Sequence, residues 1–106
     1  MGCAVTIIHW SGPALRDLEA ALDYIAKDNR EAADRLAEAV YIAVSRLKRF
    51  PASGRMVPEL EDPNLREIIH SPFRVIDQER GNAVDLLAAI RAEQDLDLVD
   101  ILSRSV

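Results

Sequence analysis

The order of hydrophobic and polar positions predicts two helices near the start of the chain. From residue 14 to residue 29, apolar side chains recur every three or four positions, the repeat of one face of an amphipathic helix. The repeat resumes from 31 to 50, so two helices joined by a short turn should form an antiparallel hairpin. Ser11 suits the N-cap of the first helix and Pro13 its first turn. Asn29 can either cap the second helix or take a left-handed turn.

Strand patterns flank this hairpin on both sides. Residues 5–9 form a short β-rich run before it, and a Pro-Ala-Ser-Gly turn follows it, in which Gly54 can supply a positive φ. Pro58 marks the first strand after the turn as an edge or irregular piece. The last strand is apolar on both faces near its middle, as expected of a central strand. The predicted strands after the hairpin are 55–60, 65–70, 73–79 and 84–90, with a turn at 80–82 and a weakly amphipathic helix at 95–102.

These elements predict an α+β fold in the order β-α-α-β-β-β, followed by a short C-terminal helix. We expect an antiparallel sheet that packs one face against the helical hairpin. The length of 106 residues suits a single core, and we find no internal repeat or low-complexity linker. Residues 1–106 are therefore expected to form one domain. Trp10 and Met56 are expected in its core.

Composition and charge restrict the classes of partner. No apolar run approaches the roughly 20 residues that span a bilayer, and a lone Cys3 fits a reducing cytoplasm. The formal net charge is −5, and residues 51–106, with six arginines and eleven acidic residues, account for all of it. Because proteins that bind phosphate backbones usually carry excess positive charge, we expect no direct DNA binding. The sequence predicts no metal site and no cofactor.

Three stretches of the sequence carry a resemblance to a known family. Residues 50–60 read FPASGRMVPEL and residues 65–76 read LREIIHSPFRVI; before them, residues 9–29 read HWSGPALRDLEAALDYIAKDN. Together, and in this order, they resemble the ParE/RelE superfamily of toxins from type II toxin–antitoxin modules. The tail, AVDLLAAIRAEQDLDLVDI, resembles it more loosely. The resemblance implies a cytoplasmic bacterial protein that a cognate antitoxin binds and neutralises, with any promoter DNA bound by the antitoxin.

Two activities are known in this superfamily. RelE-like members cut messenger RNA on the ribosome, whereas ParE-like members inhibit DNA gyrase and are not known to turn over a substrate. Cleavage by 2′-hydroxyl attack needs a base, an acid and cations. This chain lacks most of the residues that supply these groups in RelE-like members. Its two tyrosines, Tyr24 and Tyr41, lie on the predicted helices, and Asp77 stands at the usual tyrosine position. Arg91 stands where many relatives have a histidine, and Gln94 replaces a basic residue.

The resemblance therefore implies a ParE-like inhibitor of DNA gyrase rather than an enzyme. Two alternatives stay open: a RelE-like ribosome-dependent mRNA endonuclease, and a non-toxic member that retains only antitoxin binding. For an endonuclease the candidate catalytic residues are Arg74, Arg91 and His70. His9 is a weaker candidate base, and Glu67 with Asp77 forms a possible acid/base pair. Ordinary surface histidines and salt-bridged carboxylates are the competing interpretation.

Strand alternation predicts where the arginines point. Over residues 73–80, Phe73 and Val75 share one face, and Arg74 and Arg80 share the other. If the apolar faces pack on the helices, Arg74, Arg80 and Arg91 line an open face of the sheet. Arg66 joins them in one of the possible registers. These arginines either pair with nearby carboxylates or bind an acidic partner segment, here the antitoxin.

The helical hairpin offers further candidates for binding an antitoxin, because a partner helix needs exposed apolar groups. Tyr24 and Tyr41 are the main candidates, with Ala21 and Ile42 beside them.

Overall fold

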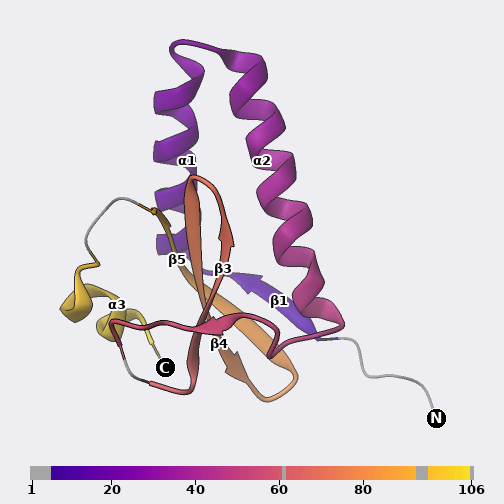
Figure 1. Ribbon diagram of the computed structural model, residues 1–106, viewed down its shortest axis with the longest axis vertical. Coiled ribbons are helices and arrows are strands. Elements are labelled where there is room, and N and C mark those ends of the chain that lie inside the picture. Colours follow the sequence, from indigo (N-terminus) through magenta and orange to yellow (C-terminus); the bar gives the residue numbers. More distant parts are fainter. Residues whose placement is uncertain (1–5, 61, 93–95, 106) are drawn as a thin grey trace.

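The computed structural model describes residues 6–60, 62–92 and 96–105, so Cys3, Gln94 and Asp95 lie outside the described residues. A helical hairpin stands against a twisted sheet, and its tip projects beyond the sheet (Figure 1). The elements are β1 (Ile7–Trp10), α1 (Gly12–Ala26), α2 (Arg30–Ser45), the 3₁₀ turn η1 (Arg46–Lys48), β2 (Arg55–Met56), β3 (Leu65–His70), β4 (Phe73–Arg80), β5 (Ala83–Arg91) and α3 (Leu98–Arg104).

Side-chain caps fix the starts of both hairpin helices. The Ser11 hydroxyl accepts a hydrogen bond of 3.1 Å from the Ala14 N–H, which confirms Ser11 as the N-cap of α1. Asn29 takes the first of its two predicted options and caps α2, because its Oδ1 accepts a 3.0 Å hydrogen bond from the Ala32 N–H. The second helix is shorter than predicted: it ends at Ser45 and tightens into η1.

The strands form one sheet in the order β1-β5-β4-β3-β2. Pairing is antiparallel from β5 to β2, while β1 joins β5 in parallel. The central position predicted for the last strand is confirmed, since β5 lies between β1 and β4. The strand predicted over 55–60 is only two residues long, because the chain turns at Val57, whose carbonyl accepts from the Leu60 N–H.

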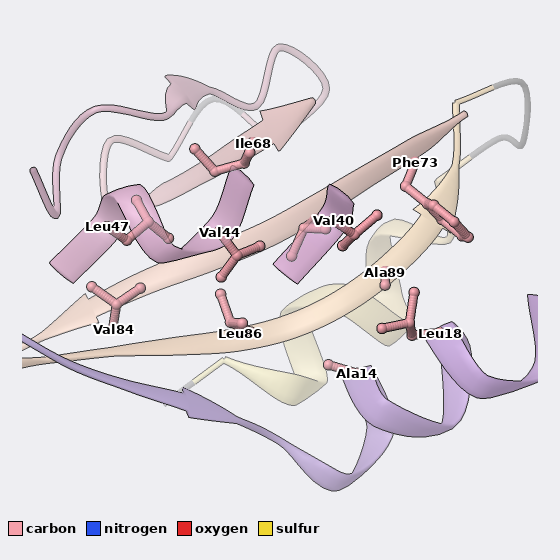
Figure 2. Packing of buried hydrophobic residues seen from close by; sticks show 11 residues of the cluster. Ala14, Leu18, Val40, Val44, Leu47, Ile68, Phe73, Val84, Leu86 and Ala89 are labelled. Carbon is pink, nitrogen blue, oxygen red and sulfur yellow. The ribbon is translucent and has the colours of Figure 1, made fainter. Parts of the chain in front are cut away.

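Both faces of the sheet carry a hydrophobic cluster. On the hairpin side, side chains of α1 and α2 pack on β3, β4 and β5 (Figure 2). On the second side, Ile101 of α3 packs with Val57, Ile76 and Ala88. This second face is therefore partly covered, and not open as the sequence suggested. Met56 is exposed, contrary to prediction, and Val57 takes the buried position; Trp10 packs against the hairpin-side cluster.

A β-bulge in β5 changes which way its last residues point. Ile76 pairs with Ala88 and Asp77 pairs with Leu86, so Leu87 is the extra residue. Before it, Val84 and Leu86 face the hairpin; after it, Ala89 does. The bulge shifts the alternation by one residue, so strict alternation gives the wrong face beyond it. No helix in the described ranges is long and apolar enough to cross a membrane.

Gly54 is required for close approach rather than for an unusual backbone angle. A Cβ atom there would lie 2.8 Å from the Glu67 carbonyl oxygen and 3.3 Å from the Arg66 Cβ, whereas Gly81 is the described glycine with a positive φ, of 61°. The predicted positive φ at Gly54 is thus wrong. The turn instead needs a residue without a side chain, because it packs directly on β3.

We expect Gly54→Ala to lower the free energy of unfolding by about 1–3 kcal/mol, since backbone atoms must move to admit the methyl group. Urea denaturation followed by circular dichroism measures the change. Gly12→Ala is the matched control, because its Cβ would meet only the flexible end of the Arg16 side chain. Equal stability of the two variants would contradict the close-approach explanation.

Candidate functional site

A buried network of charges lies on the second face of the sheet. The Glu67 side chain, fully buried, accepts hydrogen bonds from Arg55 Nε at 2.6 Å and from Arg74 Nε at 2.7 Å. The other two nitrogens of Arg74 donate to both oxygens of Glu59, at 2.8 and 2.9 Å. Such bidentate pairs are strong and geometrically specific. The network therefore ties β2 and the turn that follows it to the middle of the sheet.

These contacts shift the pKa values of the partners. The hydrogen bonds from Arg74 hold the pKa of Glu59 at about 2 and outweigh desolvation, and the same pair raises the pKa of Arg74. Arg74 is thus a fully engaged structural cation with its side chain only 8% exposed. It is not placed to stabilise the charge of an external phosphate.

Asp77 is the second unusual charge. Its side chain lies in the hairpin-side layer, because it pairs with Leu86, and neither carboxyl oxygen has a hydrogen-bond partner. Desolvation raises its pKa to about 7; Arg66 opposes this shift and Glu79 adds to it. Glu67 and Asp77 cannot form an acid/base pair, since adjacent register positions place them on opposite faces.

A third group of charges surrounds Asp85 on the second face. Arg80 donates to both of its oxygens, at 2.6 and 3.0 Å, and its Oδ1 lies 3.4 Å from Nδ1 of the exposed His9. Hydrogen bonding to Arg80 lowers the pKa of Asp85. Beside it, Arg104 of α3 donates to Asp17 and to the Leu87 carbonyl at the bulge, which fastens α3 to the sheet. Arg80 therefore pairs with a nearby carboxylate, which was one of the two alternatives predicted for the arginines.

Tyr24 and Arg91, two of the predicted partner-binding residues, come together on the hairpin side. Arg91 pairs with Phe73, so the bulge places it beside α1 rather than on the face of Arg74 and Arg80. Two adjoining hollows, of about 250 and 340 Å³, share Ala21, Tyr24 and Arg91 in their lining. We call this surface the Tyr24 groove. Tyr24 is 63% exposed there.

Tyr41, the other predicted tyrosine, borders a different hollow, between α2 and β1. It is 65% exposed and contributes to a pocket of about 140 Å³. We call this the edge pocket; its lining residues are Ile8, Trp10, Tyr41, Val44, Ser45 and Lys48.

The predicted site residues thus separate into several places. Arg66 donates to the Gly54 carbonyl at 3.2 Å, and His70 lies half-buried at the end of β3. Of the candidate catalytic residues, Arg74 points to the second face of the sheet, whereas His70 and Arg91 flank Phe73 in one cross-strand row on the hairpin side. Among the described residues, no three His, Cys, Asp or Glu side chains gather to hold a metal ion.

Sequence reasoning missed Glu59, Lys48 and the role of Trp10. Glu59 binds Arg74 across 15 positions of the chain, and the local sequence pattern around either residue does not predict this pairing. The edge pocket is likewise formed by residues far apart in sequence, from β1 and α2. The one available signal was the pair of tyrosines on the polar side of two amphipathic helices.

Known proteins resemble this chain in sequence pattern and in fold. The sequence profile of a family described as "ParE toxin of type II toxin-antitoxin system, parDE" matches residues 8–104. Curated protein sequences give no significant match. A chain of the chromosomal ParDE toxin–antitoxin system from P. aeruginosa is similar in structure, with a TM-score of 0.70 and 23% identity over 86% of this chain and 100% of that chain. A chain of the toxin–antitoxin complex RelBE2 from Mycobacterium tuberculosis has a TM-score of 0.56 and 16% identity over 82% and 98% of the two chains.

Proposed function

Because the chain belongs to the ParE toxin family of type II toxin–antitoxin systems, we propose that it inhibits DNA gyrase by binding and that a cognate antitoxin neutralises it. Its place of action is then the bacterial cytoplasm. The observation that carries this proposal over RNA cleavage is the engagement of Arg74 by Glu59 and Glu67. Because these two carboxylates hold Arg74, its charge is not available to stabilise a phosphorane transition state at the centre of the sheet.

Asp77 and the two tyrosines do not supply groups for RNA cleavage on the surface of the sheet either. Asp77 stands where ribonuclease relatives carry tyrosine, but its side chain is 1% exposed and cannot reach a substrate. Both tyrosines lie on the hairpin helices instead. Their exposure suits protein contacts, in which tyrosine and arginine contribute most of the binding energy.

We assign gyrase binding to the Tyr24 groove, which combines an exposed aromatic ring, an arginine and a floor of small residues. Induction of the chain alone in bacteria is expected to arrest growth, and the purified protein is expected to inhibit gyrase supercoiling. Tyr24→Ala with Arg91→Ala should weaken that inhibition by about 10-fold or more. Arg35→Ala, on the exposed side of α2 and paired only with Glu31 among the described residues, is the control.

The remaining outcomes distinguish the alternatives. Arrest with intact supercoiling and cleaved ribosome-bound message would replace gyrase inhibition with endonuclease activity. Harmless expression of soluble, folded protein would identify a member that retains only antitoxin binding. Co-expression with the antitoxin encoded in the same module should restore growth, and the two proteins should purify as a complex. Failure to form that complex would contradict the proposed neutralisation.

A further inference from the structure

Positive charge is concentrated in one stretch of this acidic chain. Residues 39–58 contain no Asp or Glu and four basic side chains, those of Arg46, Lys48, Arg49 and Arg55. The rest of the chain carries nine basic and eighteen acidic side chains, so the net charge of −5 divides into +4 for this stretch and −9 for the remainder. The net charge of the whole chain therefore does not describe the electrostatic potential beside residues 39–58.

Three of these cations lie together where α2 tightens into η1, at the end of α2 far from the hairpin tip (Figure 1). Leu47 is fully buried and anchors the turn in the hairpin-side cluster. The N–H groups of Arg49 and Phe50 donate to the Arg46 carbonyl at 3.2 and 3.0 Å, which closes the turn. The exposed side chains around Leu47 are those of Arg46, Lys48 and Arg49, which we call the basic corner.

The cations of the basic corner are not neutralised within the chain. None of the three forms an ion pair with another described residue, whereas carboxylates hold the arginines on the second face of the sheet. At about 2.0 Å of rise per residue, residues 46–49 span about 6 Å of backbone. This span is shorter than the Debye length of about 8 Å at physiological ionic strength, so the three charges act on one partner together. The basic corner therefore favours a partner with several closely spaced negative charges.

An exposed aromatic ring adjoins the basic corner. Phe50 follows Arg49 directly and is 61% exposed. Surfaces that bind single-stranded nucleic acid combine cations along the phosphate backbone with aromatic rings on which bases stack. An acidic peptide would use the cations but has no base to stack on the ring. The combination therefore favours a nucleic acid strand over an acidic protein segment.

We propose that the basic corner and Phe50 bind single-stranded DNA, with the three cations on phosphates and the ring stacked on one base. The choice of DNA over RNA rests on the proposed function, because gyrase acts on DNA. A DNA contact adds to the affinity of this chain wherever gyrase presents a DNA strand beside it. The proposal revises, for this corner alone, the expectation from net charge that the chain binds no DNA.

The direct test uses the purified chain without gyrase and a fluorescein-labelled oligothymidylate of about 12 nucleotides. Fluorescence anisotropy at about 50 mM salt should detect binding. The logarithm of the binding constant should fall with the logarithm of salt concentration with a slope of about −2, since each phosphate contact on a single strand contributes about −0.7. Absence of binding, or a slope near zero, would overturn this proposal and leave gyrase inhibition intact, because gyrase takes no part in the measurement.

Charge reversal locates the binding surface. Arg46→Glu combined with Arg49→Glu should weaken oligothymidylate binding by about 10-fold or more. Arg30→Glu combined with Arg35→Glu is the matched control, because it changes the net charge equally at the other, exposed end of α2. The sixteen residues of α2 span about 24 Å, well beyond the Debye length of about 8 Å. Equal losses in the two double variants would mean that binding follows net charge and would overturn docking at the basic corner.

Replacement of the aromatic ring tests the class of partner. Phe50→Ala should weaken oligothymidylate binding by about 5-fold or more, the loss of one stacked base. Wild-type affinity for a labelled polyglutamate peptide of equal charge should be lower than for oligothymidylate and unchanged in Phe50→Ala. Tighter binding of the peptide would assign the basic corner to an acidic protein segment and overturn the proposal. Binding of oligouridylate without binding of oligothymidylate would overturn the choice of DNA.

Discussion

Replacing Arg74 with alanine is expected to lower the free energy of unfolding by about 3–5 kcal/mol, because it leaves Glu67 buried with one partner instead of two. The Glu67 side chain is fully buried, and Arg55, its remaining partner, is largely exposed. Urea denaturation at pH 7 measures the loss. Arg55→Ala should cost less, since Arg74 still neutralises Glu67 in that variant.

A paired substitution separates the cost of an orphaned charge from the loss of packing. Arg74→Met combined with Glu67→Leu removes both buried charges and fills their space, and replacements of this kind are often neutral or stabilising. We expect the double variant to recover most of the stability lost in Arg74→Ala. A double variant as unstable as Arg74→Ala would mean that burial of charge is not the source of the effect.

The charge network also predicts how the stability of the fold changes at acidic pH. The pKa of Glu59 is depressed to about 2 in the folded chain, from 4.5. A depressed carboxyl pKa stabilises the fold above its unfolded value, and this contribution is lost as pH falls from about 4.5 to about 2. Arg74→Ala should remove this part of the acid sensitivity along with the pair.

Asp77 is expected to give the opposite dependence on pH. Its folded pKa of about 7 lies above the unfolded value of 3.8, so the folded chain holds a proton that the unfolded chain releases. Stability should therefore fall as pH rises from about 4 to about 7, by about 4 kcal/mol in total, at 1.4 kcal/mol per pKa unit. Denaturation curves recorded across this range measure the slope.

Asp77→Asn tests the assignment, because it keeps the size of the side chain and removes its ionisation. The variant should match the wild type near pH 4 and exceed its stability by about 4 kcal/mol at pH 8. Glu38→Gln is the control, since Glu38 is an exposed carboxylate on α2. A wild-type slope that persists in Asp77→Asn would assign the titration to another group.

Both predictions concern charged side chains in the middle of the sheet, which affect stability. The candidate binding surfaces lie elsewhere, at the periphery of the molecule. The Tyr24 groove and the edge pocket are on different sides of the helical hairpin, beside β5 and β1 respectively. Variants at these surfaces should change binding with little effect on stability, because Tyr24 and Tyr41 are both exposed. Variants in the network should do the reverse.

Local patterns in the sequence were sufficient for the hairpin and for most of the sheet. The apolar repeat and the caps at Ser11 and Asn29 act within a few residues, so helix starts and the turn between helices follow from nearby side chains. Strand alternation correctly placed Phe73 and Val75 opposite Arg74, because β4 keeps its alternation against β3. The motifs around the Pro-Ala-Ser-Gly turn also indicated the family correctly.

The partners and the burial of the charged side chains follow only from the tertiary structure. Leu87 interrupts the alternation of β5, and this one extra residue moves Arg91 from the face of Arg74 to the side of α1. Arg74 meets Glu59, and Arg104 meets Asp17 across 87 positions, through pairings that depend on how distant elements pack. Burial turns Asp77 from an ordinary acid into one that titrates near neutrality. A sequence pattern records periodicity along one element, whereas desolvation and ion pairing depend on what the other elements bring beside it.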